Sequence, residues 1–94
     1  MEATLLTITP DGFDPQEITR PASRFILSLE NHSGMEQLTL RLAQEGGDGS
    51  PLREIIMTRE QMKWSDELEL QPGTYLLTET GNPAWLCRLT ITAP

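Results

Sequence analysis

The side chains that could do chemistry in this sequence are few and far apart. The 94 residues contain one histidine, His32, and one cysteine, Cys87. A histidine-based zinc or copper site needs a second histidine, and a Ser-His-Asp triad or other general-base arrangement would depend on His32 alone. We therefore predict that the protein is not an enzyme. We also predict that His32, which stands in a turn between Asn31 and Ser33, is a surface residue.

The single cysteine lies in a segment with an alternating pattern. Trp85, Cys87, Leu89 and Ile91 are each separated by one residue, and this period of two is typical of a strand with one face on a core. A buried free cysteine behaves as a small hydrophobic residue. We therefore predict that Cys87 packs in the core and takes no part in metal or redox chemistry. One cysteine also excludes a disulfide within the chain.

Three methionines offer thioether sulfurs, which are soft ligands suited to Cu(I). Met35, Met57 and Met62 do not form a clustered methionine motif in the sequence. Methionine is also the side chain that best fills irregular gaps in a core. The spacing therefore favours core packing for all three.

The charge balance excludes some partners. Seven basic and fourteen acidic residues give a net charge of −7, whereas binding to nucleic acid or to an anionic membrane depends on clustered Lys and Arg. No run is long and apolar enough to span a bilayer. Residues 1–4 lack the basic and then apolar pattern of a signal peptide. We expect no nucleic acid partner and no membrane insertion, and the acidity is consistent with solubility.

Short alternating segments separated by turn residues run through the whole chain. Pro21 limits pairing in the second segment and predicts an edge position there. Thr58 and Gln61 have the spacing of a capping box, which predicts one short helical turn near 58–64. Residues 1–94 thus predict a single all-β domain, an antiparallel Greek-key β-sandwich of seven or eight strands. The expected strands are 4–9, 16–20, 24–30, 37–43, 52–57, 65–71, 74–78 and 85–92.

Three segments carry a family resemblance. Residues 12–22 read GFDPQEITRPA, residues 25–31 read FILSLEN, and residues 71–75 read QPGTY. In this order and spacing they resemble the cupredoxins, the blue-copper β-sandwich family. The first is similar to the family's run GF-x-P-x-x-I-x-x-P-A-G, with Ser23 in place of the last glycine. The second is similar to the strand ending in Asn before the first copper ligand, and the third to PGTY before the ligand loop.

The resemblance also implies where a copper site would lie. Blue copper needs two histidines and a cysteine thiolate, usually with a weak axial methionine. At the corresponding positions this sequence has Gln37 and Asn82 for the histidines, Glu79 for the cysteine and Leu86 for the methionine. The resemblance therefore implies the fold without its blue-copper site, and we expect no cofactor.

The same end of the sandwich remains a candidate binding site, formed by Gln37, Glu79, Asn82 and Trp64. An exposed Trp64 would anchor an interface, whereas a buried one would be part of the core. We expect a protein partner at this surface.

A non-standard metal site is the alternative, using Glu36, Glu79 and His32. Some cupredoxin-like proteins associated with bacterial iron uptake carry carboxylates in this region. However, a hard cation normally takes more than two oxygen ligands. The competing interpretation is that both carboxylates lie on a solvated rim.

The sequence leaves three interpretations open, two of function and one of fold. The first is a non-enzymatic cupredoxin-like module without a blue-copper site, acting as a binding or accessory domain. The second is a divergent metal-binding or electron-transfer protein that uses the carboxylate and histidine site. The third is a generic immunoglobulin- or fibronectin-like sandwich, which strand order would distinguish. The resemblance points to the periplasm or another extracytoplasmic compartment, because cupredoxins are typically exported.

Overall fold

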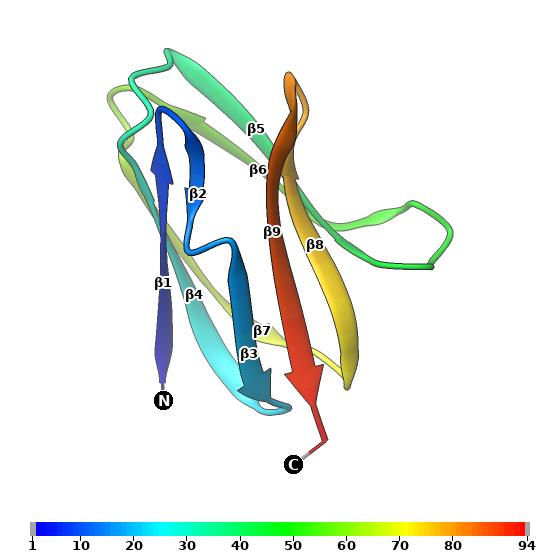
Figure 1. The fold of residues 1–94 in the computed structure, drawn as a ribbon. Helices are drawn as coiled ribbons and strands as arrows, with labels where there is room; N and C mark the ends of the chain where they lie inside the picture. Colours follow the sequence, from blue (N-terminus) through cyan, green and yellow to red (C-terminus); the bar gives the residue numbers. More distant parts are fainter. Residues whose placement is uncertain (1, 94) are drawn as a thin grey trace.

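A computed structural model describes residues 2–93, which form two β-sheets packed face to face (Figure 1). The described residues contain nine strands, one more than the upper end of the sequence-based range. The strands are β1 (Ala3–Thr9), β2 (Gly12–Asp14), β3 (Glu17–Pro21), β4 (Arg24–Asn31), β5 (Gln37–Gln44), β6 (Pro51–Thr58), β7 (Lys63–Glu69), β8 (Gly73–Glu79) and β9 (Asn82–Thr92).

The strand order mixes antiparallel and parallel pairs. One sheet has the order β2-β1-β4-β7 and the other the order β3-β9-β8-β5-β6. Most neighbours are antiparallel, but β1 pairs with β4 and β3 pairs with β9 in parallel. The predicted all-β sandwich is confirmed, and these two parallel pairs are a difference in detail from its antiparallel description. The reason is that the chain crosses to the second sheet after β2 and returns for β4, which then runs in the direction of β1.

The core follows the alternation seen in the sequence. In β4, Phe25, Leu27 and Leu29 are buried, and in β5 the same holds for Leu38, Leu40 and Leu42. Cys87 is also buried, at 2% exposure, as predicted. Burial of such side chains contributes about 1.5–3 kcal/mol each, which fixes the register of both sheets.

Two local predictions are wrong. Residues 13–15 lie between the expected strands 4–9 and 16–20, but Phe13 belongs to β2 and is 3% exposed. Residues 58–64 contain no helical turn. The Gln61 amide does donate to the Thr58 hydroxyl at 3.1 Å, as a capping box would have it. The Arg59 amide, however, donates to the Glu36 carbonyl, and β7 begins at Lys63, so pairing between strands prevails over the local helix signal.

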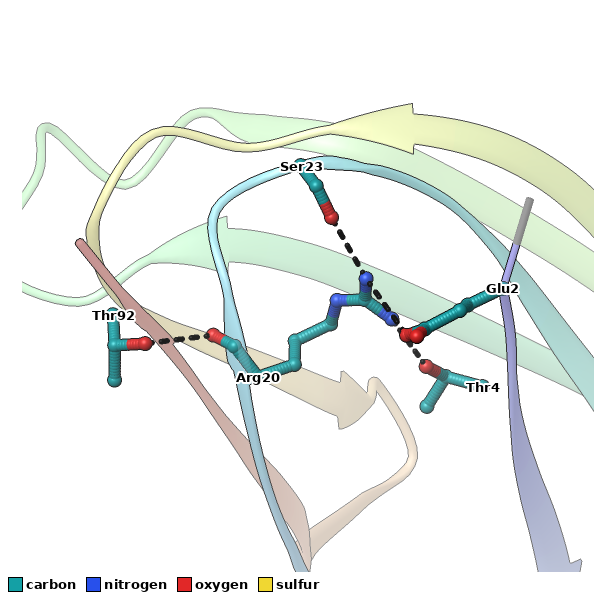
Figure 2. A network of polar contacts seen from close by, with 5 residues as sticks. All are labelled: Glu2, Thr4, Arg20, Ser23 and Thr92. Carbon is teal, nitrogen blue, oxygen red and sulfur yellow. Dashed lines mark hydrogen bonds and ion pairs between the residues drawn. The ribbon is translucent and has the colours of Figure 1, made fainter. Parts of the chain in front are cut away.

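One edge strand is held by a buried arginine. Arg20 lies in β3, which is an edge strand as Pro21 predicted, and the residue is 8% exposed. Its guanidinium donates to the Thr4 hydroxyl at 3.1 Å and to the Ser23 hydroxyl at 2.9 Å (Figure 2). Its carbon Cζ lies 4.1 Å from the centre of the Phe25 ring. Arg20 therefore joins the second sheet to the first sheet at the end where both termini lie (Figure 1).

Loops of the other end bring distant segments together. The connections β1–β2, β4–β5, β6–β7 and β8–β9 meet there, and we call this the loop end (Figure 1). A buried glycine shapes its first turn. Gly12 has φ +122, and a Cβ added there would lie 3.3 Å from Cδ1 of Trp85.

Among residues 2–93, no helix has the length and hydropathy needed to cross a membrane.

The Arg20 contacts predict a measurable effect on stability. Arg20→Met should lower the free energy of unfolding by about 1–3 kcal/mol, because two hydrogen bonds from a charged donor are lost inside the protein. Urea unfolding measures this loss. The matched control is Arg24→Met, because the ion pairs of Arg24 with Glu67 and Glu69 lie on the surface and should matter little. Equal losses of unfolding free energy in the two variants would show that the buried contacts of Arg20 stabilise the protein no more than surface ion pairs do.

Candidate functional site

A buried carboxylate lies at the centre of the loop end. Glu79 is the last residue of β8 and is 4% exposed. Its Oε2 accepts a hydrogen bond from the Thr39 amide at 2.8 Å. Its Oε1 accepts one from the Gly81 amide at 2.7 Å and one from the Asn82 side-chain amide at 3.0 Å. We call these four residues the Glu79 clasp.

The clasp connects β5 to the turn between β8 and β9. A second contact supports it, because the Thr80 amide donates to the Thr39 carbonyl at 3.0 Å. A buried carboxylate is stable only when donors satisfy its oxygens, and Glu79 receives three. The expectation that Glu79 lies on a solvated rim is therefore wrong, and both of its oxygens are already engaged in hydrogen bonds within the chain.

A second network, which sequence analysis did not predict, holds the neighbouring loops. Asn31 is 4% exposed, and its Oδ1 accepts hydrogen bonds from the Ser33 amide and hydroxyl. Its Nδ2 donates to the Thr58 carbonyl at 3.3 Å, and its own amide donates to the Met62 carbonyl at 2.7 Å. Asn31 therefore fixes the β4–β5 and β6–β7 connections relative to each other. Its polar neighbours His32 and Ser33 had suggested only a turn.

The structure brings together only some of the predicted site residues. Glu79 and Asn82 are hydrogen bonded, whereas Glu36 and Gln37 are exposed. His32 is a surface residue as predicted, with Nε2 4.0 Å from Glu30 Oε1. Trp64 lies in β7 opposite Leu29 and packs, half-buried, against the core.

The residues present do not fit a blue-copper centre. The cysteine needed for it would be a thiolate beside two histidines. Burial, with a smaller effect of Glu17, raises the pKa of Cys87 to about 11, so the side chain is held as a thiol. Cys87 also lies opposite Leu77 within the sheet, and His32 points to the surface. Residues 2–93 contain no group of three His, Cys, Asp or Glu side chains placed to share a metal ion.

A groove of about 420 Å³ opens beside the clasp, and we call it the Met groove. Met35 is half-buried there, and its sulfur lies 3.6 Å from the Asn82 side-chain amide. Met62 is 43% exposed, so the prediction of core packing is wrong for it, while it is confirmed for Met57, which is fully buried. The groove is lined by Asn31, His32, Gly34, Met35, Arg59 and Met62.

Comparison with known proteins identifies the fold. No family model and no curated protein sequence matches the chain. Reduced auracyanin from Roseiflexus castenholzii superposes with a TM-score of 0.76 and 13% identity, covering 100% of this chain and 98% of that one. Auracyanin A, a "blue" copper protein from Chloroflexus aurantiacus, gives a TM-score of 0.75 and 13% identity over 96% of this chain and 98% of that one.

A Cu(I) amicyanin variant gives a TM-score of 0.70 with 14% identity, covering 95% of this chain and 81% of that one. These proteins are cupredoxins, and the chain has the cupredoxin-like fold. The superposition over nearly the whole chain supports this fold over the alternative of a generic sandwich. At such identities the likeness concerns the fold alone.

The clasp predicts that Glu79 is needed for stability. Glu79→Gln should lower the free energy of unfolding by about 1–3 kcal/mol, because the new amide group cannot accept from every N–H that faces it. Urea unfolding measures the loss. Glu36→Gln is the matched control, since Glu36 is exposed in the neighbouring loop and should unfold like the native protein. A Glu79→Gln protein as stable as this control would contradict the clasp.

Proposed function

We propose that residues 1–94 act as one non-enzymatic, cupredoxin-like binding or accessory module that works without a blue-copper site. The loop end is the binding surface, and a protein is the partner. The support is that hydrogen bonds within the chain, accepted by Glu79 and donated by Asn31, hold this end together. No bound ion is needed for the surface to keep its shape.

The observation that carries this proposal is the exposed methionine of the Met groove. Met62 is 43% exposed beside a groove whose floor includes the half-buried Met35. Methionine is enriched in protein interfaces, and its flexible side chain adapts to the surface that it meets. The backbone around Met62 is fixed by the Asn31 amide, so a partner would find the surface preformed.

The charge of the chain favours a cationic partner. The net charge is −7, and five arginines are already paired with carboxylates, namely Arg20, Arg24, Arg41, Arg53 and Arg88. A partner with basic groups around its contact surface is attracted at long range, and salt weakens that attraction. Association should therefore slow as the ionic strength rises.

The fold supports an extracytoplasmic location, the periplasm of a bacterium in particular, because cupredoxins are typically exported. The other function that the sequence left open, metal handling or electron transfer through Glu36, Glu79 and His32, has less support. Both oxygens of Glu79 accept hydrogen bonds within the clasp, and an ion would have to displace these donors.

Site-specific crosslinking tests the docking surface. A photoreactive benzoylphenylalanine in place of Met62, in the cells that make the protein, should form an adduct with one partner. The same replacement at Leu5 is the control, because Leu5 is 53% exposed but lies on β1, away from the loops. The identified partner should then bind the purified domain roughly tenfold more weakly after Met62→Asp, since the contact is apolar, and unchanged after Leu5→Asp.

Two outcomes would overturn the docking surface. One is an absence of adducts from position 62. The other is the same set of adducts from positions 62 and 5, which would indicate non-specific collision.

A further inference from the structure

Three soft donor side chains that are far apart in the sequence line the Met groove. The sequence has four methionines, one histidine and one cysteine. His32 and Met35 reach the groove from the β4–β5 connection, and Met62 reaches it from the β6–β7 connection. These three residues form no motif in the sequence, but in the folded protein they line one groove.

The main chain at each donor is held in place. The His32 amide donates to the Ile8 carbonyl at 2.7 Å, and the Met62 carbonyl accepts from Asn31 at the same distance. The Met35 amide donates to the Ser33 hydroxyl at 3.2 Å. Binding at such a site costs little ordering of the backbone, because the hydrogen bonds have already fixed it.

The donors themselves are accessible. His32 has a side-chain exposure of 52%, and Met62 is 43% exposed. Met35 is half-buried, and the Asn82 amide, 3.6 Å from its sulfur, orients the thioether. Thioether and imidazole ligands favour soft metal ions, Cu(I) above all, over hard cations that prefer oxygen.

We propose that the Met groove binds one soft monovalent cation, Cu(I), through the sulfurs of Met35 and Met62 and the imidazole of His32. The site differs from a blue-copper centre because it has no thiolate. It binds the ion without changing its oxidation state. The inference does not depend on the docking proposal, since the ion alone is the probe.

Some charged groups around the groove favour the binding of a cation, and one opposes it. Glu30 lies 4.0 Å from His32, and Glu36 and Glu60 lie beside Arg59 in the adjoining hollow. These carboxylates favour a cation. The Arg59 guanidinium, which also lines the groove and donates to the Gly34 carbonyl at 2.7 Å, opposes it. Removal of this charge should therefore tighten binding, which is the opposite of the effect expected for a donor.

Titration with Ag(I), a redox-inert substitute, and with Cu(I) under anaerobic conditions tests the site. Calorimetry gives affinity and stoichiometry, and the methyl signals of ¹³C-labelled methionines report where the ion binds. One ion per chain should bind, shifting the Met35 and Met62 signals and sparing buried Met57. Met62→Leu, Met35→Leu and His32→Gln should each weaken binding by roughly tenfold or more, Met57→Leu should not, and Arg59→Gln should tighten binding.

The cysteine needs its own control, because Ag(I) binds thiols. The Cys87→Ala protein should bind as the native one does, and the methyl signals locate the ion even if this variant is unstable. Three results would overturn the proposal: no binding of either ion, binding that Met62→Leu and Met35→Leu leave unchanged, or binding that disappears only with Cys87.

Discussion

The buried carboxylate of Glu79 is the interaction on which the loop end depends. Removing a charged group from water is costly unless donors replace the lost water, and three N–H groups from Thr39, Gly81 and Asn82 do so. By resemblance, Glu79 stands where a cupredoxin would place its copper-binding cysteine. In this chain the Glu79 side chain accepts hydrogen bonds that connect β5 with the β8–β9 turn.

Once the chain itself holds this end, its surface side chains are available for other purposes. The hydrogen bonds of Asn31 hold the β4–β5 and β6–β7 connections in place. The groove between these connections is lined by Met35, Met62 and His32, among others. The same arrangement supports both proposals. A protein partner would use the apolar surface of the methionines, and a soft cation would use their sulfurs.

The sequence predicts what depends on local periodicity and fails where distant segments meet. The alternation in β4, β5 and β9 predicts which face is buried, and Pro21 predicts an edge strand. The parallel pairing of β1 with β4 was not predictable, because it depends on where the chain crosses between sheets. The capping-box spacing after Thr58 predicts a helix that pairing with β4 and the Glu36 carbonyl prevents.

For the candidate site, too, some residues are predicted from the sequence and others are not. Gln37, Glu79 and Asn82 were found through the resemblance, and Glu79 with Asn82 does form one unit. A single Glu in a sequence resembles a solvated residue, and the Thr39 amide that connects Glu79 to β5 lies forty residues away in the chain. The Met groove was missed for a similar reason, since residues 35 and 62 become neighbours only when two loops meet. Local sequence patterns predict neither of these long-range contacts.

Amide hydrogen exchange of the Thr39 and Gly81 N–H groups, in protein freed of metal by a chelator, tests the clasp most directly. If Glu79 holds the loop end, both amides exchange slowly without any metal. Their exchange becomes fast in Glu79→Gln while the core amides of β4 stay protected. Fast exchange in the native protein, or protection that arises only when a metal ion is added, would contradict a loop end held by hydrogen bonds alone.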